Sequence, residues 1–263
     1  MTGLEMAAVA AAGFAAGGIN AVVGSGTLVT FPVLLAVGLP PVTATISNSL
    51  GLVPGNLTGA LGYRRELSGQ GRLLRRLLPA SALGALTGAF LLLHLPPSAF
   101  ETIVPVLVGL AVVLVVIQPA VQRALARRRA AAGALEPDQL NLSRGRLAAL
   151  LAGAYATGSY GGYFAASQGV LQIGVFGLLI PESLQRLNAL KNVLSMAVNA
   201  VAATAYIVVA GDRLDWTAAG LVATGSLLGG YVGASAGRRL PPLVLRSAIV
   251  LLGITAIVVL VTR

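Results

Sequence analysis

Long runs of hydrophobic residues, separated by short polar or glycine-rich segments, make up most of this chain. The runs at 77–93, 103–117, 193–209 and 243–261 carry few or no charged side chains. About 20 apolar residues are needed to cross the hydrocarbon core of a bilayer, so these runs are typical of transmembrane helices. Residues 6–23 form a further run, with no Lys or Arg before it and no polar domain after it. We interpret this run as a retained first helix rather than a signal peptide.

The composition and charge distribution favour a membrane protein in the same way. Of the 263 residues, 56% are hydrophobic and 10% are charged, and the mean hydropathy is +0.87, whereas soluble domains carry roughly 25% charged residues. The net charge of +10 does not indicate a nucleic-acid partner, because the basic residues gather in short loops at 64–76, 123–146 and 238–246. By the positive-inside rule these loops are cytoplasmic, and the loops at 94–101 and 211–215 face outward, as does the N-terminus.

The chain matches itself at a spacing of about 145 residues, which predicts an internal repeat. LGALTGA at Leu83 matches LGGYVGA at Leu228, and HLPP at His94 matches RLPP at Arg239. The two LPP turns have opposite charge surroundings and should lie on opposite sides of the membrane, so the repeat is inverted, as in many secondary transporters.

The pattern therefore predicts an all-α integral membrane protein. We expect about eight long transmembrane helices plus two short broken or re-entrant helices. They form two inverted repeats, 1–122 and 147–263, joined by a flexible cytoplasmic linker at 123–146.

Two apolar segments are too short to cross the membrane and mark the expected breaks. The first, 27–37, follows Gly24-Ser25-Gly26, and the second, 169–180, ends at Pro181. At about 1.5 Å rise per residue, neither spans ~30 Å of hydrocarbon. Broken backbone is tolerated at membrane depth where it is buried or lines a cavity, and a helix N-terminus favours an anion. The two breaks therefore predict an anion site between the halves.

The candidate substrate-binding residues lie at the breaks or on the helix that follows each break. They are Gly24, Ser25, Gly26, Thr27, Asn48, Gly161, Gly162, Ser167, Gln168, Asn188, Lys191 and Asn192. Lys191 is the only lysine and lies inside a helix expected at 184–210. It either binds or gates the solute, or it snorkels to the headgroups or forms a structural ion pair. Asn48 and Asn192, at matching places in the halves, either contact the solute or link helices by hydrogen bonds.

Other features favour structural roles. The spacing of Gly51, Gly55 and Gly59 is typical of close helix packing. Glu182 either starts a helix or carries a coupling proton, and the first reading is favoured. Gly24-Ser25-Gly26 is loosely similar to the nucleophile region of an intramembrane serine protease, but the only histidine, His94, lies at a helix end. Cysteine is absent and no acidic pair or histidine cluster lies inside a span, so we expect neither an enzyme nor a metal or cofactor.

Four segments resemble the TauE/SafE family of sulfite and organosulfonate exporters. They read GFAAGGINAVVGSGTLVTFPVLLAVGLPPVTAT, GSYGGYFAASQGVLQIGVFGLLIP, RLNALKNVLSMAVNAVAA and LLGGYVGASAGRRLPP. The most specific parts are NALKN and YGGYF, and the resemblance covers nearly the whole chain.

The resemblance implies a multi-pass protein of the bacterial inner membrane that exports a small sulfur-containing anion. Among the candidates, it points to Gly24, Ser25, Gly26, Asn48, Gly161, Gly162, Asn188, Lys191 and Asn192. The expected partners are this anion and the lipid bilayer, with a homo-oligomer as an option. An anion channel, an uptake carrier for another small anion and a non-transporting membrane subunit remain as alternatives.

Overall fold

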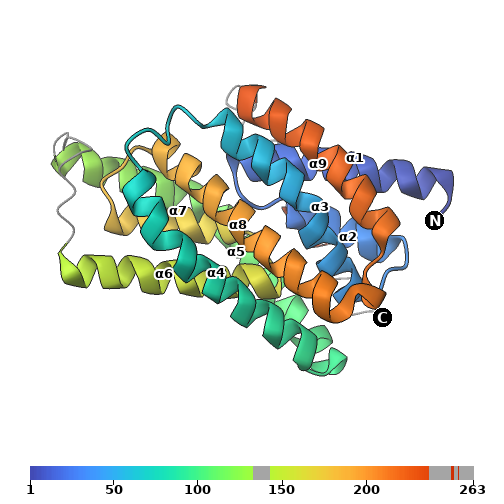
Figure 1. Ribbon diagram of the computed structural model, residues 1–263. Coiled ribbons are helices and arrows are strands. Elements are labelled where there is room, and N and C mark those ends of the chain that lie inside the picture. The colour runs from blue at the N-terminus through green and yellow to red at the C-terminus, as the bar shows by residue number, and fades with distance from the viewer. Residues whose placement is uncertain (133–142, 237–249, 252–253, 255–263) are drawn as a thin grey trace.

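The computed structural model describes residues 1–132, 143–236, 250, 251 and 254, and these residues form helices and connecting turns without a β-strand (Figure 1). The helices are α1 (Gly3–Val22), α2 (Thr27–Ala36), α3 (Pro41–Gly62), α4 (Gly71–His94), α5 (Pro97–Ala132), α6 (Arg144–Tyr163), α7 (Gln168–Leu179), α8 (Leu184–Ala210), the short 3₁₀ helix Gly211–Arg213, and α9 (Trp216–Ala236).

The helix limits follow the sequence patterns closely. Helix α8 has the bounds expected from its apolar run, and the two short helices α2 and α7 begin at the expected breaks. The linker predicted at 123–146 is helical at both ends, because residues 123–132 continue helix α5 and residues 144–146 begin helix α6. The long helix expected at 243–261 falls almost wholly outside the described residues, so the count of eight long helices stays a prediction.

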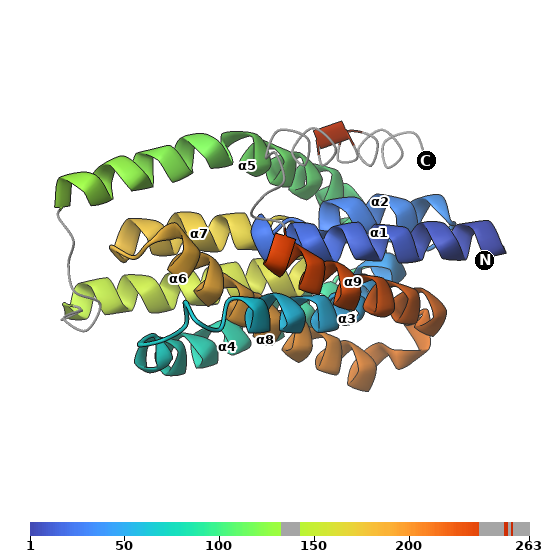
Figure 2. The ribbon, with the colours of Figure 1, turned by 90° about the horizontal axis from the view of Figure 1, so that it is seen from above.

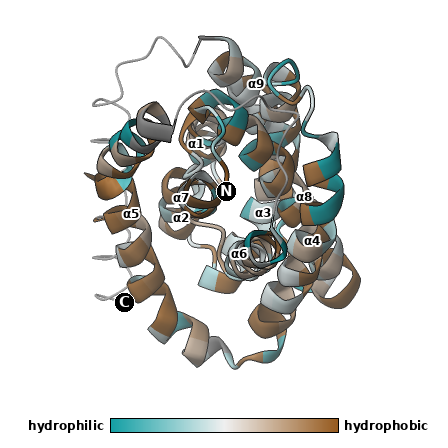
Figure 3. Cartoon of the chain, turned by 90° about the vertical axis from the view of Figure 1, so that its left-hand side faces the viewer, coloured by the Kyte–Doolittle hydropathy of each residue, from teal (hydrophilic) through white to brown (hydrophobic). Residues whose placement is uncertain are grey.

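Several helices are suited to a bilayer by length and composition. Four described segments, Gly3–Val22, Gly71–His94, Ser98–Arg127 and Leu184–Arg213, are long and apolar enough to cross a membrane. Large apolar side chains point away from the bundle, among them Leu83 on α4 and Val106 on α5, which are 60% and 70% exposed. Figure 3 shows this apolar character along α5. Since water would penalise such a surface, the chain is an integral membrane protein.

Each short helix forms a hairpin with the long helix before it. Helices α1 and α2 lie against each other, as do α6 and α7. The α1–α2 hairpin enters from the end of the bundle that holds the N-terminus, here called the N-terminal end (Figure 2). The α6–α7 hairpin enters from the opposite end, called the linker end, which also holds the 63–70 loop. The two hairpins therefore meet inside the bundle.

The long helices around the hairpins pack against α4 and α9. Helix α1 packs on α9 and α6 packs on α4, while α3 packs on α9 and α8 packs on α4. Helices α3 and α8 also contact each other, and α5 covers the hairpins from the other side through contacts with α2 and α7 (Figure 3).

Glycines bring the backbones of these pairs together. A Cβ atom on Gly84 of α4 would lie 2.2 Å from the Tyr155 carbonyl oxygen of α6. On Gly229 of α9 it would lie 1.8 Å from the Phe14 carbonyl oxygen of α1. Small residues at such positions allow the close backbone contact that drives helix association in lipid. The contacts of Gly51 and Gly55 with α9 confirm the packing interpretation of the glycine spacing on α3.

This packing predicts a clear difference between two glycines of α9. Gly229→Ala should lower the thermal denaturation midpoint of the purified protein by several degrees, since overpacking a tight contact costs about 1–3 kcal/mol. Gly220→Ala is the matched control, because a Cβ atom there meets nothing within 4 Å. Equal midpoints for the two variants would contradict the packing of α1 on α9.

Candidate functional site

The turns between the helices of each hairpin, here called the tips, comprise residues 23–26 and 164–167. The first tip turns at Gly24, whose φ of +88° lies in the left-handed region that glycine adopts without steric cost. The second tip places two residues with a Cβ atom in this region, Ala165 at φ 64° and Ser167 at φ 59°. Such a conformation costs of order 1 kcal/mol per residue and persists where the surroundings fix it.

Hydrogen bonds hold the second tip in this shape. The Tyr160 hydroxyl donates to the Ala166 carbonyl oxygen, and the Ser167 hydroxyl donates to the Ala111 carbonyl oxygen of α5 over 3.2 Å. The backbone N–H of Gln168 donates to the Ala165 oxygen at 3.3 Å. Strained backbone fixed from several sides is often found at functional sites.

The two tips touch each other in the interior of the bundle. The Gly169 N–H donates to the Gly24 carbonyl oxygen over 3.1 Å. A Cβ atom added to Gly24 would lie 2.5 Å from the Gly169 Cα atom, and one on Gly169 would lie 2.6 Å from the Gly24 Cα atom. Neither position therefore accepts a side chain while the tips are in contact.

Lys191 of helix α8 packs against the contact between the two tips, which is called the junction below. Its ammonium group donates to the carbonyl oxygens of Asn20 at 2.7 Å and Ala21 at 3.4 Å. Its aliphatic stem packs beside both tip glycines, because a Cβ atom on Gly24 or Gly169 would lie 3.2 or 2.7 Å from the Lys191 Cδ atom. With 1% of its surface exposed, Lys191 does not snorkel to headgroups.

The NALKN motif caps the end of α1. Asn188 and Asn192 donate from Nδ2 to the Ala21 carbonyl oxygen at 3.2 and 3.3 Å, on either side of the Lys191 bonds. Residues three and four apart share one helix face, so the spacing aims all three side chains at the same point. The last carbonyls of a helix lack intrahelical partners and carry its negative dipole end, which suits these donors.

Polar side chains also form hydrogen bonds around the start of α2. The Gly26 N–H donates to Asn20 Oδ1 at 2.7 Å, and Asn20 Nδ2 donates to Asn56 Oδ1 at 3.2 Å. Asn48 of α3 donates to the Thr27 hydroxyl at 3.2 Å and accepts from the Thr30 hydroxyl at 2.5 Å. In this conformation Asn48 links helices, and the expected open amides of Gly26 and Gly169 are engaged within the protein.

Several buried polar atoms around the junction have no partner among the described residues. They include the Ser25 hydroxyl, Gln168 Nε2, Gln172 Nε2 and Asn188 Oδ1. Buried polar groups are nearly always hydrogen-bonded in native structures, so unpaired ones call for a bound ligand or water. Ser25 and Gln168 are 0% and 3% exposed, so neither side chain is open to solvent in this conformation.

The predicted residues are thus largely brought together, with one exception. Most of the candidate substrate-binding residues surround the two tips. Gly161 leaves room for the Gln168 side chain, because a Cβ atom on Gly161 would lie 2.4 Å from it. Gly162 instead faces helix α4, where its Cβ atom would lie 2.2 Å from the Ala85 carbonyl oxygen. Gly162 is therefore a packing position of the α4–α6 contact.

Sequence reasoning missed two glutamines near the junction. Gln118 of α5 is buried and donates to the Val23 carbonyl oxygen at 3.5 Å, and Gln172 of α7 accepts from the Ser195 hydroxyl at 3.0 Å. Both lie next to apolar stretches of their helices. A polar residue in such a segment usually faces the interior of the bundle, and this signal was available in the sequence.

The remaining polar candidates lie elsewhere. Glu182 forms an ion pair with Arg186 at 2.5 Å, and Arg186 also donates to the Ser68 carbonyl oxygen at 2.9 Å. His94 stacks on Phe90 with ring centroids 4.0 Å apart, while the Ser25 hydroxyl has no partner in the described part of the chain. The serine–histidine pair that a protease would need is not formed.

Many membrane transporters contain broken helices that meet at a polar centre near the membrane midplane, and the two hairpins of this bundle meet at such a buried polar centre. The family model described as "Sulfite exporter TauE/SafE" matches residues 9–260. The chain therefore belongs to the TauE/SafE family.

Curated relatives carry transporter names. "Probable membrane transporter protein YfcA" of Escherichia coli strain K12 is 25% identical over 242 residues, covering 89% of this chain and 83% of that protein. A "Probable membrane transporter protein" of Haemophilus influenzae is 32% identical over 96 residues, 36% of this chain and 38% of that protein. "Probable membrane transporter protein ORF9" of Sinorhizobium sp is 35% identical over 98 residues, 36% of this chain and 37% of that protein. No solved structure matches the chain significantly. The chain is a membrane transporter, and these names leave its substrate open.

The closed junction predicts how the site reacts with aqueous thiol reagents. The natural chain has no cysteine, so Ser25→Cys introduces a single thiol. In membrane vesicles without substrate it should react with a small, water-soluble maleimide at least ten times more slowly than Ser68→Cys, since Ser25 is 0% exposed and Ser68 lies exposed in a loop. Equal labelling rates would show that the junction is open.

Proposed function

We propose that this protein exports a small sulfur-containing anion, sulfite or an organosulfonate, through a site between the two hairpin tips. The observation that carries the proposal is Lys191, a fully buried cation at the junction with no carboxylate within ion-pair distance among the described residues. A buried charge without a counter-ion is costly in a membrane and marks a functional site. An anion would supply the missing negative charge.

The proposed transport site needs a conformational exchange. The ammonium group leaves the carbonyls of Asn20 and Ala21 and binds the anion, and the unpaired donors of Ser25 and Gln168 complete its coordination. The direct contact of Gly24 with Gly169 supports a carrier that opens to one side at a time, because an open channel would keep this point accessible. The same contact argues against a permanently conducting pore.

An inverted repeat would give the two sides equivalent gates. The pairing of α1 with α9 corresponds to that of α6 with α4, if the second half repeats the first. The tip contact between hairpins that enter from opposite ends supports the same relation (Figure 2). A carrier of this type exposes its central site by moving one repeat against the other.

The proposed orientation follows the basic residues. The 63–70 loop, which contains Arg64 and Arg65, and the start of α6, which contains Arg144 and Arg146, lie at the linker end. The positive-inside rule assigns this end to the cytoplasm. The N-terminus then faces the outside of a bacterial inner membrane. An anion leaving a negative-inside cell gains about 2.3 kcal/mol per charge per 100 mV, so the membrane potential alone could drive export.

Flux through reconstituted proteoliposomes tests the substrate and the role of Lys191. Labelled sulfite should move saturably, and competition by organosulfonates and carboxylates defines the substrate class. Lys191→Met should reduce the flux at least tenfold, since it removes the charge that binds the anion. Asn56→Leu is the matched control, because it removes a hydrogen bond to Asn20 near the end of α1 without changing charge, and Asn56 is not a candidate ligand.

The outcomes separate a substrate role from a structural one. Sulfite flux unchanged in Lys191→Met would remove Lys191 from the site. Equal losses in both variants, together with equally lowered denaturation midpoints, would show that Lys191 serves only to cap α1. Absence of any small-anion flux in the wild-type protein would favour a non-transporting subunit.

Single cysteines test the orientation independently of substrate. Ser68→Cys lies in the 63–70 loop at the linker end, and Ser98→Cys lies near the start of α5 at the N-terminal end, and both positions are exposed. In intact cells a membrane-impermeant maleimide should label Ser98→Cys, while Ser68→Cys should react only after permeabilisation. The reverse pattern would place the linker end outside.

A further inference from the structure

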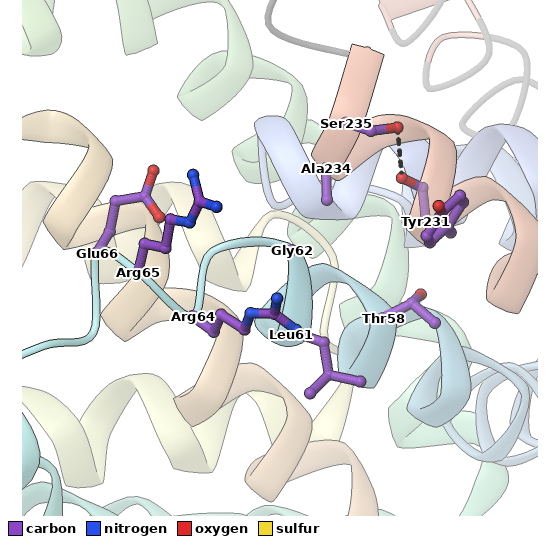
Figure 4. A pocket seen from close by; sticks show the side chains of 9 residues that line it. All are labelled: Thr58, Leu61, Gly62, Arg64, Arg65, Glu66, Tyr231, Ala234 and Ser235. Atoms are coloured by element: carbon purple, nitrogen blue, oxygen red, sulfur yellow. Dashed lines mark hydrogen bonds between the residues drawn. The ribbon is translucent and has the colours of Figure 1, made fainter.

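A pocket of about 580 Å³ lies where the C-terminal ends of α3 and α9 meet the loop that follows α3. Helix α3 contributes Thr58, Leu61 and Gly62, the loop contributes Arg64, Arg65 and Glu66, and α9 contributes Tyr231, Ala234 and Ser235 (Figure 4). Ligand pockets typically have volumes of about 300–1,000 Å³, so this one has room for a small polar group.

The polar side of the pocket carries a net positive charge, with Arg64 and Arg65 beside the single carboxylate of Glu66 among the lining residues. Arg64 and Arg65 are both exposed, and the structure gives neither a carboxylate partner within the described residues. In Figure 4 the Arg64 side chain extends along Leu61 toward Thr58. Two arginines on one loop, neither with a carboxylate partner among the described residues, suit a phosphate group, which arginine binds through paired hydrogen bonds.

The other side of the pocket is continuous with the lipid-facing surface. Leu61 and Tyr231 line the pocket and are 55% and 69% exposed. Beside them Leu57 of α3 and Leu228 of α9 are exposed as well. Tyrosine is typical of the membrane interface, where its ring lies among acyl chains and its hydroxyl reaches the headgroups. A ligand here would contact arginines at one end and apolar side chains at the other.

We propose that this pocket binds an anionic phospholipid, with the phosphate headgroup against Arg64 and Arg65 and the acyl chains along Leu57, Leu61 and Leu228. The exposed apolar wall favours a lipid over a free anion, which would gain nothing from it. Basic pockets between helix ends at the cytoplasmic face are a recognised setting for anionic headgroups. No residue of the two tips lines the pocket, so the proposal does not depend on the identity of the transported solute.

Thermal denaturation of the full chain, purified in a neutral detergent, tests the lipid site. Dioctanoyl phosphatidylglycerol should raise the denaturation midpoint with a saturable dose dependence. Dioctanoyl phosphatidylcholine and inorganic phosphate should have little effect, because one lacks the net charge and the other lacks the acyl chains. Arg64→Gln combined with Arg65→Gln should raise the half-saturating phosphatidylglycerol concentration at least about tenfold, and each single variant should have an intermediate effect.

The matched control is Arg72→Gln combined with Arg75→Gln, which removes the same charge from the exposed start of α4 at the same end of the bundle. It should leave the half-saturating concentration within about twofold of wild type. Equal stabilisation by phosphatidylcholine would overturn the anionic headgroup, and equal stabilisation by phosphate would make this a free-anion site. An equal effect of the α4 pair would reduce the interaction to general charge attraction and also overturn the proposal.

Discussion

The contact of Lys191 with the last carbonyls of α1 holds the centre of this protein together. A helix that stops inside a bilayer exposes carbonyl oxygens which water cannot reach, and each unpaired group there costs several kcal/mol by an order-of-magnitude estimate. Helix α8 meets this requirement with Asn188, Lys191 and Asn192, all on one face. The hairpin α1–α2 can therefore end in the interior, and the position of the tip depends on α8.

The tip contact in turn depends on the absence of side chains. Gly24 and Gly169 approach so closely that neither tolerates a Cβ atom, and the Lys191 stem fills the space beside them. Hydrophobic burial gives little drive for helix association within lipid, so close packing and hydrogen bonds take over that role. The same logic explains why glycines recur where α1 meets α9 and where α4 meets α6. The close glycine packing and the hydrogen bonds of the polar centre therefore hold the helices together jointly.

Much of the fold could be predicted from sequence because it follows from local properties. Apolar runs define the long helices, and Gly24-Ser25-Gly26 and Pro181 mark where the short helices begin or end. The partner of Lys191 could not be predicted. Snorkelling, ion pairing and a cavity all remained open, and the Asn20 carbonyl lies 171 residues away in the chain. Gly162 was predicted to belong to the site because it lies beside the second break in the sequence. Only the packing of α6 against α4 shows that it faces α4 instead.

The kind of partner that Lys191 has decides what the proposed carrier can bind. A carboxylate would neutralise the ammonium group and repel an incoming anion, whereas carbonyl dipoles leave its net charge in place. An anion about 4 Å from the ammonium would gain roughly 4 kcal/mol at an effective dielectric constant of about 20. Each bond to a carbonyl that it displaces is worth roughly 1.5–3 kcal/mol, since the donor is charged. The exchange is then close to balanced, and a carrier needs this balance because a site that binds too strongly cannot release its solute on the other side of the membrane.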